Sequence, residues 1–318
     1  MLRFAVSKET LTWHMQDVVV SVVVPTRARP VLLARCLKTL CSQTLAPAHY
    51  EIIIVDDGPD RETRRTVETC AASLAGRGPF LHYVASNGPH GPAAARNRGW
   101  KLARGGIVAF TDDDTEPDAN WLAAGLAAFD GETDAVSGRI VVPLPPAPTD
   151  YEFDVAGLAR AEFATANVFC RKSVLTRIEG FDERFPLAWR EDSDLQFRLL
   201  RAGASIRKAG DAVVVHPVRA AGWGVSLRQQ KKVMFDVLLY REHPRLYRDR
   251  IRRAPRWDYY ITVAALLIGA AALALGADSV VIAAAAVWTS MTVWLCAKRL
   301  RHSSRRLRHI AEIMVTSV

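Results

Sequence analysis

The stretch that decides the fold is Ile107-Val-Ala-Phe-Thr-Asp-Asp-Asp114, in which a buried-type strand runs directly into three aspartates. Short runs of apolar and β-branched residues are typical of strands covered on both faces. Adjacent carboxylates repel one another by roughly a kcal/mol for each close pair at intermediate dielectric, so they favour a bound cation. Hard oxygen ligands at a strand end indicate Mg²⁺ or Mn²⁺ beside a diphosphate. Taken alone, the tripeptide also fits an acidic turn exposed to water.

The same alternation of strand and helix extends to both sides of this stretch. Further strand-like runs precede it at residues 18–24, 51–55 and 80–85. Helical spacing fills residues 30–43, 60–75, 91–104 and 117–129. This order predicts an α/β fold with a mainly parallel, mixed sheet, whose ligands lie at the carboxyl ends of the strands.

Beyond residue 130 the pattern is less regular. We expect strands within residues 135–154, over 162–170 and over 211–216, with Pro143-Leu-Pro-Pro-Ala-Pro148 as an extended connector. Glu191 and Asp192 precede an apolar helical pattern and so fall in the first turn of a helix, a position that favours acids for capping alone.

The chain has 318 residues and a formal net charge of +9, with 50% hydrophobic and 24% charged residues, which excludes a disordered or fibrous protein. The basic excess is local, because residues 241–318 hold 13 Lys and Arg against five Asp and Glu. A nucleic-acid partner is therefore not expected. Five scattered cysteines without a C-x-x-C pair argue against a disulfide framework or a structural zinc. The first 17 residues lack the apolar run of a signal peptide.

Two uncharged stretches of 19 residues, Tyr259–Ala277 and Ser279–Ala297, flank Asp278. As helices each is about 28 Å long, close to the hydrocarbon thickness of a bilayer. Basic residues at both outer ends predict a transmembrane hairpin with both ends cytoplasmic. A soluble helix pair and a shallow interfacial hairpin are the alternatives. We expect a basic helix over 299–310 to lie on anionic head groups.

Five segments in order resemble the motifs of family 2 glycosyltransferases with the GT-A fold. They are Ser21-Val-Val-Val-Pro-Thr26, Glu51-Ile-Ile-Ile-Val-Asp-Asp-Gly58, Gly91-Pro-Ala-Ala-Ala-Arg-Asn-Arg-Gly99, Phe110-Thr-Asp-Asp-Asp114, and Phe181-Asp-Glu-Arg-Phe185 with Glu191-Asp192-Ser-Asp-Leu195. The resemblance covers about residues 18–217. It implies a nucleotide-sugar donor and a divalent metal, Mg²⁺ or Mn²⁺.

The resemblance also implies roles for single residues. Those expected to bind the nucleotide-sugar are Pro25, Thr26, Arg27, Asp56, Asp57, Arg96, Asp112 and Asp113. The alternatives are a turn-capping role for Asp57 and a surface cation for Arg96, and the role of Asp113 is ambiguous. The expected metal ligands are Asp114, Asp112 and His216. For His216 the alternative is a histidine at a strand end without a role in metal binding. Many relatives have an aromatic residue at the position of Arg27, so both UDP and dTDP donors stay open.

Family 2 enzymes resemble one another in inverting the anomeric carbon by direct displacement, which needs a general base. The family pattern favours Asp192 as the base, with Glu191 touching the acceptor or orienting Asp192. Trp189 is a candidate acceptor platform, or alternatively a core residue. The motif Gln-x-x-Arg-Trp of processive relatives is not found near residue 222, so we expect transfer of one sugar.

These features together predict a membrane-anchored enzyme that glycosylates a lipid-linked saccharide. The alternatives are a polyprenyl-phosphate glycosyltransferase and, from another class, a non-catalytic sugar-binding scaffold. The expected division is an N-terminal extension (1–17), a GT-A catalytic domain (18–240), a basic linker (241–258), the hairpin (259–297) and a basic cytoplasmic tail (298–318).

Overall fold

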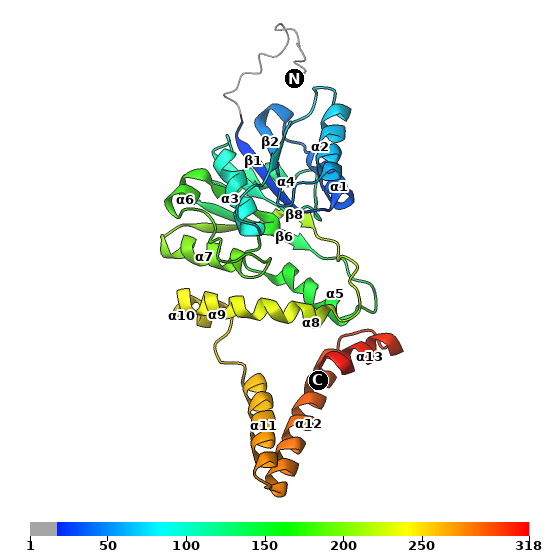
Figure 1. Ribbon diagram of the computed structural model, residues 1–318. Helices are drawn as coiled ribbons and strands as arrows, with labels where there is room; N and C mark the ends of the chain where they lie inside the picture. Colours follow the sequence, from blue (N-terminus) through cyan, green and yellow to red (C-terminus); the bar gives the residue numbers. More distant parts are fainter. Residues whose placement is uncertain (1–17, 318) are drawn as a thin grey trace.

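The computed structural model describes residues 18–317 as a mixed sheet with helices on both faces, followed by two long helices that stand away from it (Figure 1). The strand order is β3-β2-β1-β4-β7-β6-β8-β5. The strands are β1 Val20–Thr26, β2 Tyr50–Asp56, β3 Phe80–Ala85, β4 Ile107–Phe110, β5 Glu116–Pro117, β6 Ala135–Val141, β7 Val168–Arg171 and β8 Ile206–Val215. The extension expected over residues 1–17 lies outside the described residues.

The first four strands form the parallel half of the sheet. β1 pairs in parallel with β2 and β4, and β2 pairs in parallel with β3. Val22 and Ile52 lie in one buried cluster and Val23 and Ile53 in another, so the strands are apolar toward both faces. Because these strands run in the same direction, their carboxyl ends meet at one edge of the sheet.

Helices cover the two faces of the sheet in separate groups. On one face Leu37 and Trp121 share a buried cluster with Val22, and on the other Trp100 and Leu195 share one with Val23. The first group is α1 (Pro30–Leu40), α2 (Arg61–Ser73) and α4 (Trp121–Ala127), and the second is α3 (Pro92–Leu102), α6 (Lys172–Arg177) and α7 (Glu191–Arg201). The predicted α/β fold with a mixed sheet is thereby confirmed.

The second half of the sheet differs in detail from the sequence prediction. β7 is antiparallel to both β4 and β6, and the strand expected over 162–170 shortens to Val168–Arg171 because residues before it form a loop and a single 3₁₀ turn. β8 begins earlier than expected, at Ile206. Its first residues include the exposed Arg207 and Lys208. Because these residues are charged, the hydropathy of the sequence does not indicate a strand there.

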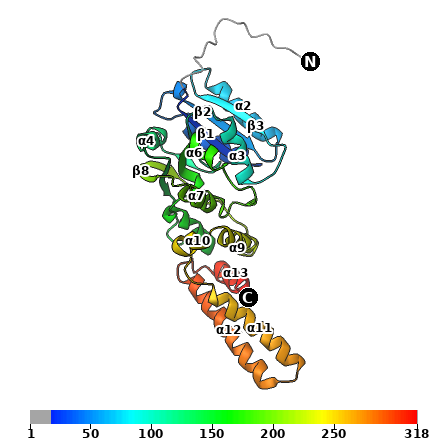
Figure 2. The same ribbon diagram turned by 90° about the vertical axis from the view of Figure 1, so that its left-hand side faces the viewer.

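A third layer lies between the sheet and the long helices (Figure 2). It consists of α5 (Asp150–Val155), α8 (Val225–Gln229), α9 (Val233–Glu242) and α10 (Pro244–Arg250). Phe235 and Leu239 of α9 pack on Phe185 and Phe197, and Ile251 joins the same cluster. The expected linker over 241–258 is therefore mostly folded, and apart from His243 only residues 251–256 of it lie outside helices.

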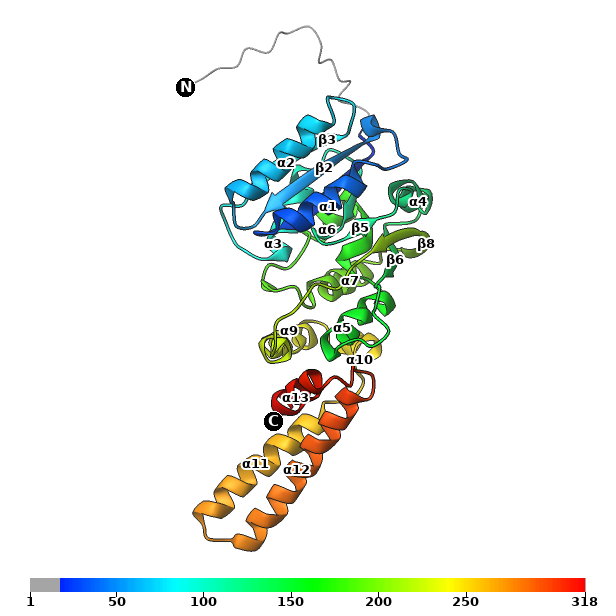
Figure 3. The same cartoon turned by 90° about the vertical axis from the view of Figure 1, so that its right-hand side faces the viewer.

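The long helices are α11 (Trp257–Ala274) and α12 (Asp278–Leu300), which pack along each other as a hairpin (Figure 3). The turn contains Gly276 with φ +68°, a conformation that favours glycine. Both helices are long and apolar enough to cross a membrane. Leu267 is 64% exposed and Ile282 70% exposed, which a soluble helix pair would avoid. The hairpin thus has the surface expected of a membrane anchor.

The basic helix expected over 299–310 is wrong. α12 continues to Leu300, the chain then turns, and α13 covers Leu307–Thr316. The break follows from a tertiary contact, because Ser304 N donates to Pro148 O at 2.6 Å and pins the turn to the proline-rich connector. Arg299 donates to Asp150 of α5 at 2.7 Å, so the end of the hairpin is fixed to the third layer.

Candidate active site

The carboxyl ends of β1 and β2 form the predicted nucleotide end of the site. Thr26 Oγ1 donates to Asp113 Oδ2 at 2.8 Å, while Pro25 is half-buried. The side chain of Arg27 is 63% exposed and its Nη1 lies 3.5 Å from Asp57 Oδ2. These residues lie together at one rim, as the sequence predicts, and their contacts with a nucleotide stay a prediction.

Asp56 organises the turn after β2. It is fully buried; its Oδ1 accepts from Gly58 N at 3.2 Å, and its Oδ2 accepts from Asp60 N at 3.2 Å and from Tyr83 Oη at 2.8 Å. A carboxylate has about four lone-pair sites, so a base N–H would have to use the one that remains. The turn role was not expected from the sequence.

Asp57 ties this turn to the start of α3. Its Oδ2 accepts from Gly91 N at 2.9 Å and its Oδ1 lies 3.2 Å from His90 Nδ1. Gly91 has φ +113°, and a Cβ there would stand 2.4 Å from Pro186 O. The glycine is thus required by a close approach of two loops, and Asp57 holds that approach.

Asp112, Asp114 and His216 form the candidate metal centre. One ligand atom from each lies within 4.8 Å of the others, and both Asp114 and His216 are buried. His216 Nε2 is 3.6 Å from Asp114 Oδ1, and its buried Nδ1 has no hydrogen-bond partner among residues 18–317. Two carboxylates and one imidazole suit Mn²⁺ or Mg²⁺, so these residues fit the expected ion.

Asp113 points away from this cluster. It is 2% exposed, its Oδ1 lies 3.1 Å from Arg29 Nη1, and its Oδ2 holds Thr26. Burial raises its pKa, and the Arg29 charge opposes that shift. In this arrangement Asp113 holds Thr26 at the end of β1, and its expected contact with the donor stays a prediction.

Arg96 of α3 links the metal cluster to the acids at the start of α7. Its Nη2 donates to Asp112 Oδ1 at 2.6 Å, and its Nη1 donates to Glu191 Oε1 at 3.2 Å. The Arg96 side chain itself is only 3% exposed. We expected Arg96 to contact a ribose or diphosphate, and Glu191 to touch the acceptor or to orient Asp192. Their direct pairing was not expected.

Glu191 and Asp192 open α7 after Arg190, whose φ of +75° turns the chain sharply into the helix. Burial, reinforced by the charge of Asp192, raises the pKa of Glu191 to about 7, against the opposing charge of Arg96. Burial also raises the pKa of Asp192, although its Oδ1 accepts from Ser193 N at 2.6 Å. Asp192 Oδ2 has no hydrogen bond to another of the described residues. Both acids therefore hold protons more readily than ordinary carboxylates.

Trp189 lies half-buried beside this pair. Its Nε1 donates to Asp236 Oδ2 at 3.1 Å, and the Arg190 guanidinium lies 4.8 Å from its ring centre. The ring also packs on the cluster around Phe185. These contacts fit a core role, while the acceptor role stays a prediction.

Several residues of the site were missed from the sequence. Arg219 Nε lies 2.9 Å from Asp114 Oδ2, and His243 Nε2 lies 3.0 Å from the buried Asp194 Oδ1. Arg219 follows His216 by three positions, the one signal that could have indicated it. His243 reaches Asp194 across 49 positions and so gives no local signal.

Comparison with known proteins agrees with this geometry. The family model "Glycosyl transferase family 2" matches residues 21–153, and "Glycosyl transferase family group 2" matches residues 107–298, more than half of the chain. The chain is 28% identical over 224 residues to "Glycosyltransferase AglE" of Haloferax volcanii, covering 67% of this chain and 71% of that protein. Other curated relatives are longer, and the chain spans half or less of their length.

A shorter match is to the "GalNAc(5)-diNAcBac-PP-undecaprenol beta-1,3-glucosyltransferase" of Campylobacter jejuni, 32% identical over 96 residues and covering 30% of this chain and 29% of that one. Among solved structures, the mannosyltransferase PcManGT from Pyrobaculum calidifontis, in complex with GDP-Man and Mn2+, aligns with a TM-score of 0.60 at 20% identity over 94% of this chain and 86% of that chain. That likeness concerns the fold. With its GT-A sheet and its matching motifs, the chain belongs to glycosyltransferase family 2.

Proposed function

We propose that this enzyme transfers a single sugar from a UDP- or dTDP-linked donor to a hydroxyl of a lipid-linked saccharide, with inversion at the anomeric carbon. The observation that carries the proposal is the bridge made by Arg96 between Asp112 of the metal cluster and Glu191 of the acid pair. In this proposal, the groups that bind the diphosphate and the group that accepts the proton belong to one site.

Asp192 is the proposed general base. Its Oδ1 is held by Ser193, which leaves Oδ2 to accept the proton of the acceptor hydroxyl as the new bond to the anomeric carbon forms. The bond from that carbon to the diphosphate breaks in the same step. A raised pKa suits a carboxylate that must take a proton near neutral pH.

Asp112, Asp114 and His216 would hold the divalent ion. When bound, the ion supplies positive charge to the departing diphosphate. Arg96 keeps the Asp112 carboxylate in place, and Arg219 lies beside Asp114, where its guanidinium is within reach of phosphate oxygens.

The acceptor assignment rests on two supports. One relative carries an undecaprenol-linked acceptor in its name, and the apolar hairpin would keep the site close to such lipids. We place the catalytic domain and both termini on the cytoplasmic side, since basic residues flank the outer ends of the hairpin.

The proposed function is tested by thermal unfolding of the full-length protein with a panel of nucleotide-sugars, with Mn²⁺, with Mg²⁺ and with chelator. The panel holds UDP-, dTDP- and GDP-linked sugars. A UDP- or dTDP-sugar that raises the midpoint only with metal is the expected result, because ligands that bind the native state stabilise it. Equal stabilisation with chelator, or by a GDP-sugar alone, would contradict the proposal.

A further inference from the structure

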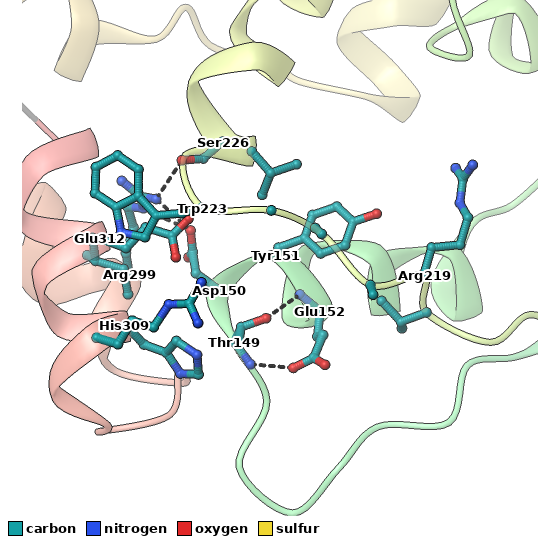
Figure 4. Close-up of a pocket in the computed structure, with 17 residues that line it drawn as sticks. Thr149, Asp150, Tyr151, Glu152, Arg219, Trp223, Ser226, Arg299, His309 and Glu312 are labelled. Carbon is teal, nitrogen blue, oxygen red and sulfur yellow. Dashed lines mark hydrogen bonds and ion pairs between the residues drawn. The ribbon is translucent and has the colours of Figure 1, made fainter.

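A cavity of about 390 Å³ lies between the catalytic domain and the C-terminal segment (Figure 4). Three parts of the chain wall it: residues 149–152 at the start of α5, the loop and helix start at residues 218–226, and Arg299 with α13. Its volume falls in the range of small-molecule sites. None of the predicted site residues lines it.

The three walls are joined to one another by partly buried polar contacts. Arg299 Nη2 donates to Asp150 Oδ2 at 2.7 Å and to Ser226 Oγ at 3.2 Å, and Glu312 accepts from Gly224 N at 2.7 Å. The α5 turn is itself fixed by a capping box between Thr149 and Glu152. These contacts therefore hold the walls of the cavity in a defined arrangement.

Several polar groups of the residues that line these walls have no hydrogen-bond partner among residues 18–317. The buried His309 Nδ1 has no hydrogen-bond partner among residues 18–317. The side chains of Tyr151, Trp223 and Arg308 likewise make no hydrogen bond with any of the described residues. Donors, acceptors and an indole that is 47% exposed together fit a polyhydroxylated ligand, whose hydroxyls both donate and accept and whose ring faces stack on aromatic groups.

Two of the residues that line the cavity link its walls to the candidate metal centre and to the hairpin. At one end its lining residue Arg219 contacts Asp114 at 2.9 Å. At the other end Arg299 belongs to the last turn of α12, where the apolar helix ends.

We infer that this cavity is the acceptor site, and that it holds the saccharide of a lipid-linked sugar diphosphate with the diphosphate next to Arg308 and the lipid toward the hairpin. The inference rests on the proposed function and names the substrate class of that same site. A lipid-anchored acceptor must reach from the bilayer to the metal centre, and this cavity runs between α12 and Arg219.

The test measures binding, independent of transfer. The full-length protein in nanodiscs is titrated with farnesyl diphosphates carrying glucose, galactose, mannose or N-acetylglucosamine, and with farnesyl diphosphate and the free sugars as comparators. At least one glycosylated probe should bind tenfold more tightly than either comparator. Arg308→Ala and His309→Ala should each weaken it by about tenfold, the scale of a lost charge-assisted or buried hydrogen bond. The matched control is Arg305→Ala, an exposed arginine that does not line the cavity.

Binding unchanged in both variants would overturn the inference, as would equal affinity for bare farnesyl diphosphate or no binding by any glycosylated probe. Thermal unfolding of each variant checks that it is folded. Metal-dependent affinity for the nucleotide-sugar, measured on the same samples, reports the proposed function separately. Acceptor binding without that affinity would contradict the function and leave the cavity assignment standing.

Discussion

Arg96 and Glu191 lie 95 positions apart and are joined in the buried centre of the site, with Nη1 of the arginine 3.2 Å from Oε1 of the glutamate. The same guanidinium holds Asp112 at 2.6 Å. One cation thus pairs with an acid that follows β4 and with an acid at the start of α7, and Glu191 Oε2 is left without a partner among the described residues. Any change at Arg96 acts on both halves of the machinery.

Arg96→Met is expected to lower the free energy of unfolding by about 3 kcal/mol, because it leaves two carboxylates without their shared buried cation. Arg98→Met on the same helix is the matched control, since among residues 18–317 the Arg98 side chain donates only to the Ala85 carbonyl, at 3.3 Å. Urea unfolding measures both. Equal losses would show that the effect comes from the helix and not from the ion pairs.

The raised pKa of Glu191 predicts a pH dependence of stability. Its ordinary value is 4.5 and burial raises it to about 7 in the folded chain, so the folded state holds the proton more tightly than the unfolded state. The stabilising effect of that proton is complete below pH 4.5 and is lost as the pH rises to about 7. At about 1.4 kcal/mol per pKa unit, the loss amounts to a few kcal/mol.

Glu191→Gln should remove this part of the pH dependence. Thermal unfolding of the metal-free protein between pH 4.5 and 8 should give a shallower fall for Glu191→Gln than for the unmodified chain, with the exposed Glu132→Gln as control. The same slope in all three proteins would mean that Glu191 does not titrate in this range.

Asp114→Asn, compared with Asp113→Asn, tests which of the two aspartates is a metal ligand. We expect metal-dependent nucleotide affinity to fall at least tenfold, because a neutral amide replaces a buried carboxylate ligand. Asp113→Asn should lower stability, since Asp113 binds Thr26 and Arg29, but should keep most of the metal effect. Calorimetry with and without Mn²⁺ distinguishes the two, and a reversed pattern would exchange their roles.

Asp192→Asn should reduce transfer by 10²-fold or more, the usual scale for a lost general base. Nucleotide-sugar binding should remain within a few-fold of the unmodified enzyme, because Asp192 contacts Ser193 and not the metal cluster. Activity and donor affinity are measured on one preparation. A parallel loss of affinity would remove Asp192 from the role of base.

The sequence predicts the parallel half of the sheet well, because burial on both faces imposes apolar runs that stand out locally. The observed β3 has the expected bounds, and the other three strands lie within two residues of them. The meeting of Asp56 and Asp112 at one edge then follows from strand direction alone. Strand direction alone does not predict the third member of the metal cluster, because His216 follows the end of β8.

The orientations of side chains were beyond the sequence because they depend on contacts between distant segments. Asp113 faces Arg29 across 84 positions, and the turn before α13 is set by the hydrogen bond from Ser304 to Pro148. The helix α5 was not predicted, because it directly follows a proline-rich stretch. Thr149 and Glu152 nevertheless have the spacing of its capping box.

The hairpin predicts a topology that can be measured in intact cells. In a variant whose five free cysteines are replaced, a single cysteine is placed by Asp278→Cys at the exposed turn between α11 and α12, or by Arg305→Cys beyond α12. If both helices cross the bilayer, a membrane-impermeant maleimide added outside should label the first and reach the second only after lysis. Labelling of neither before lysis would indicate a hairpin that stays at the interface, and the opposite pattern would place the catalytic domain outside the cell.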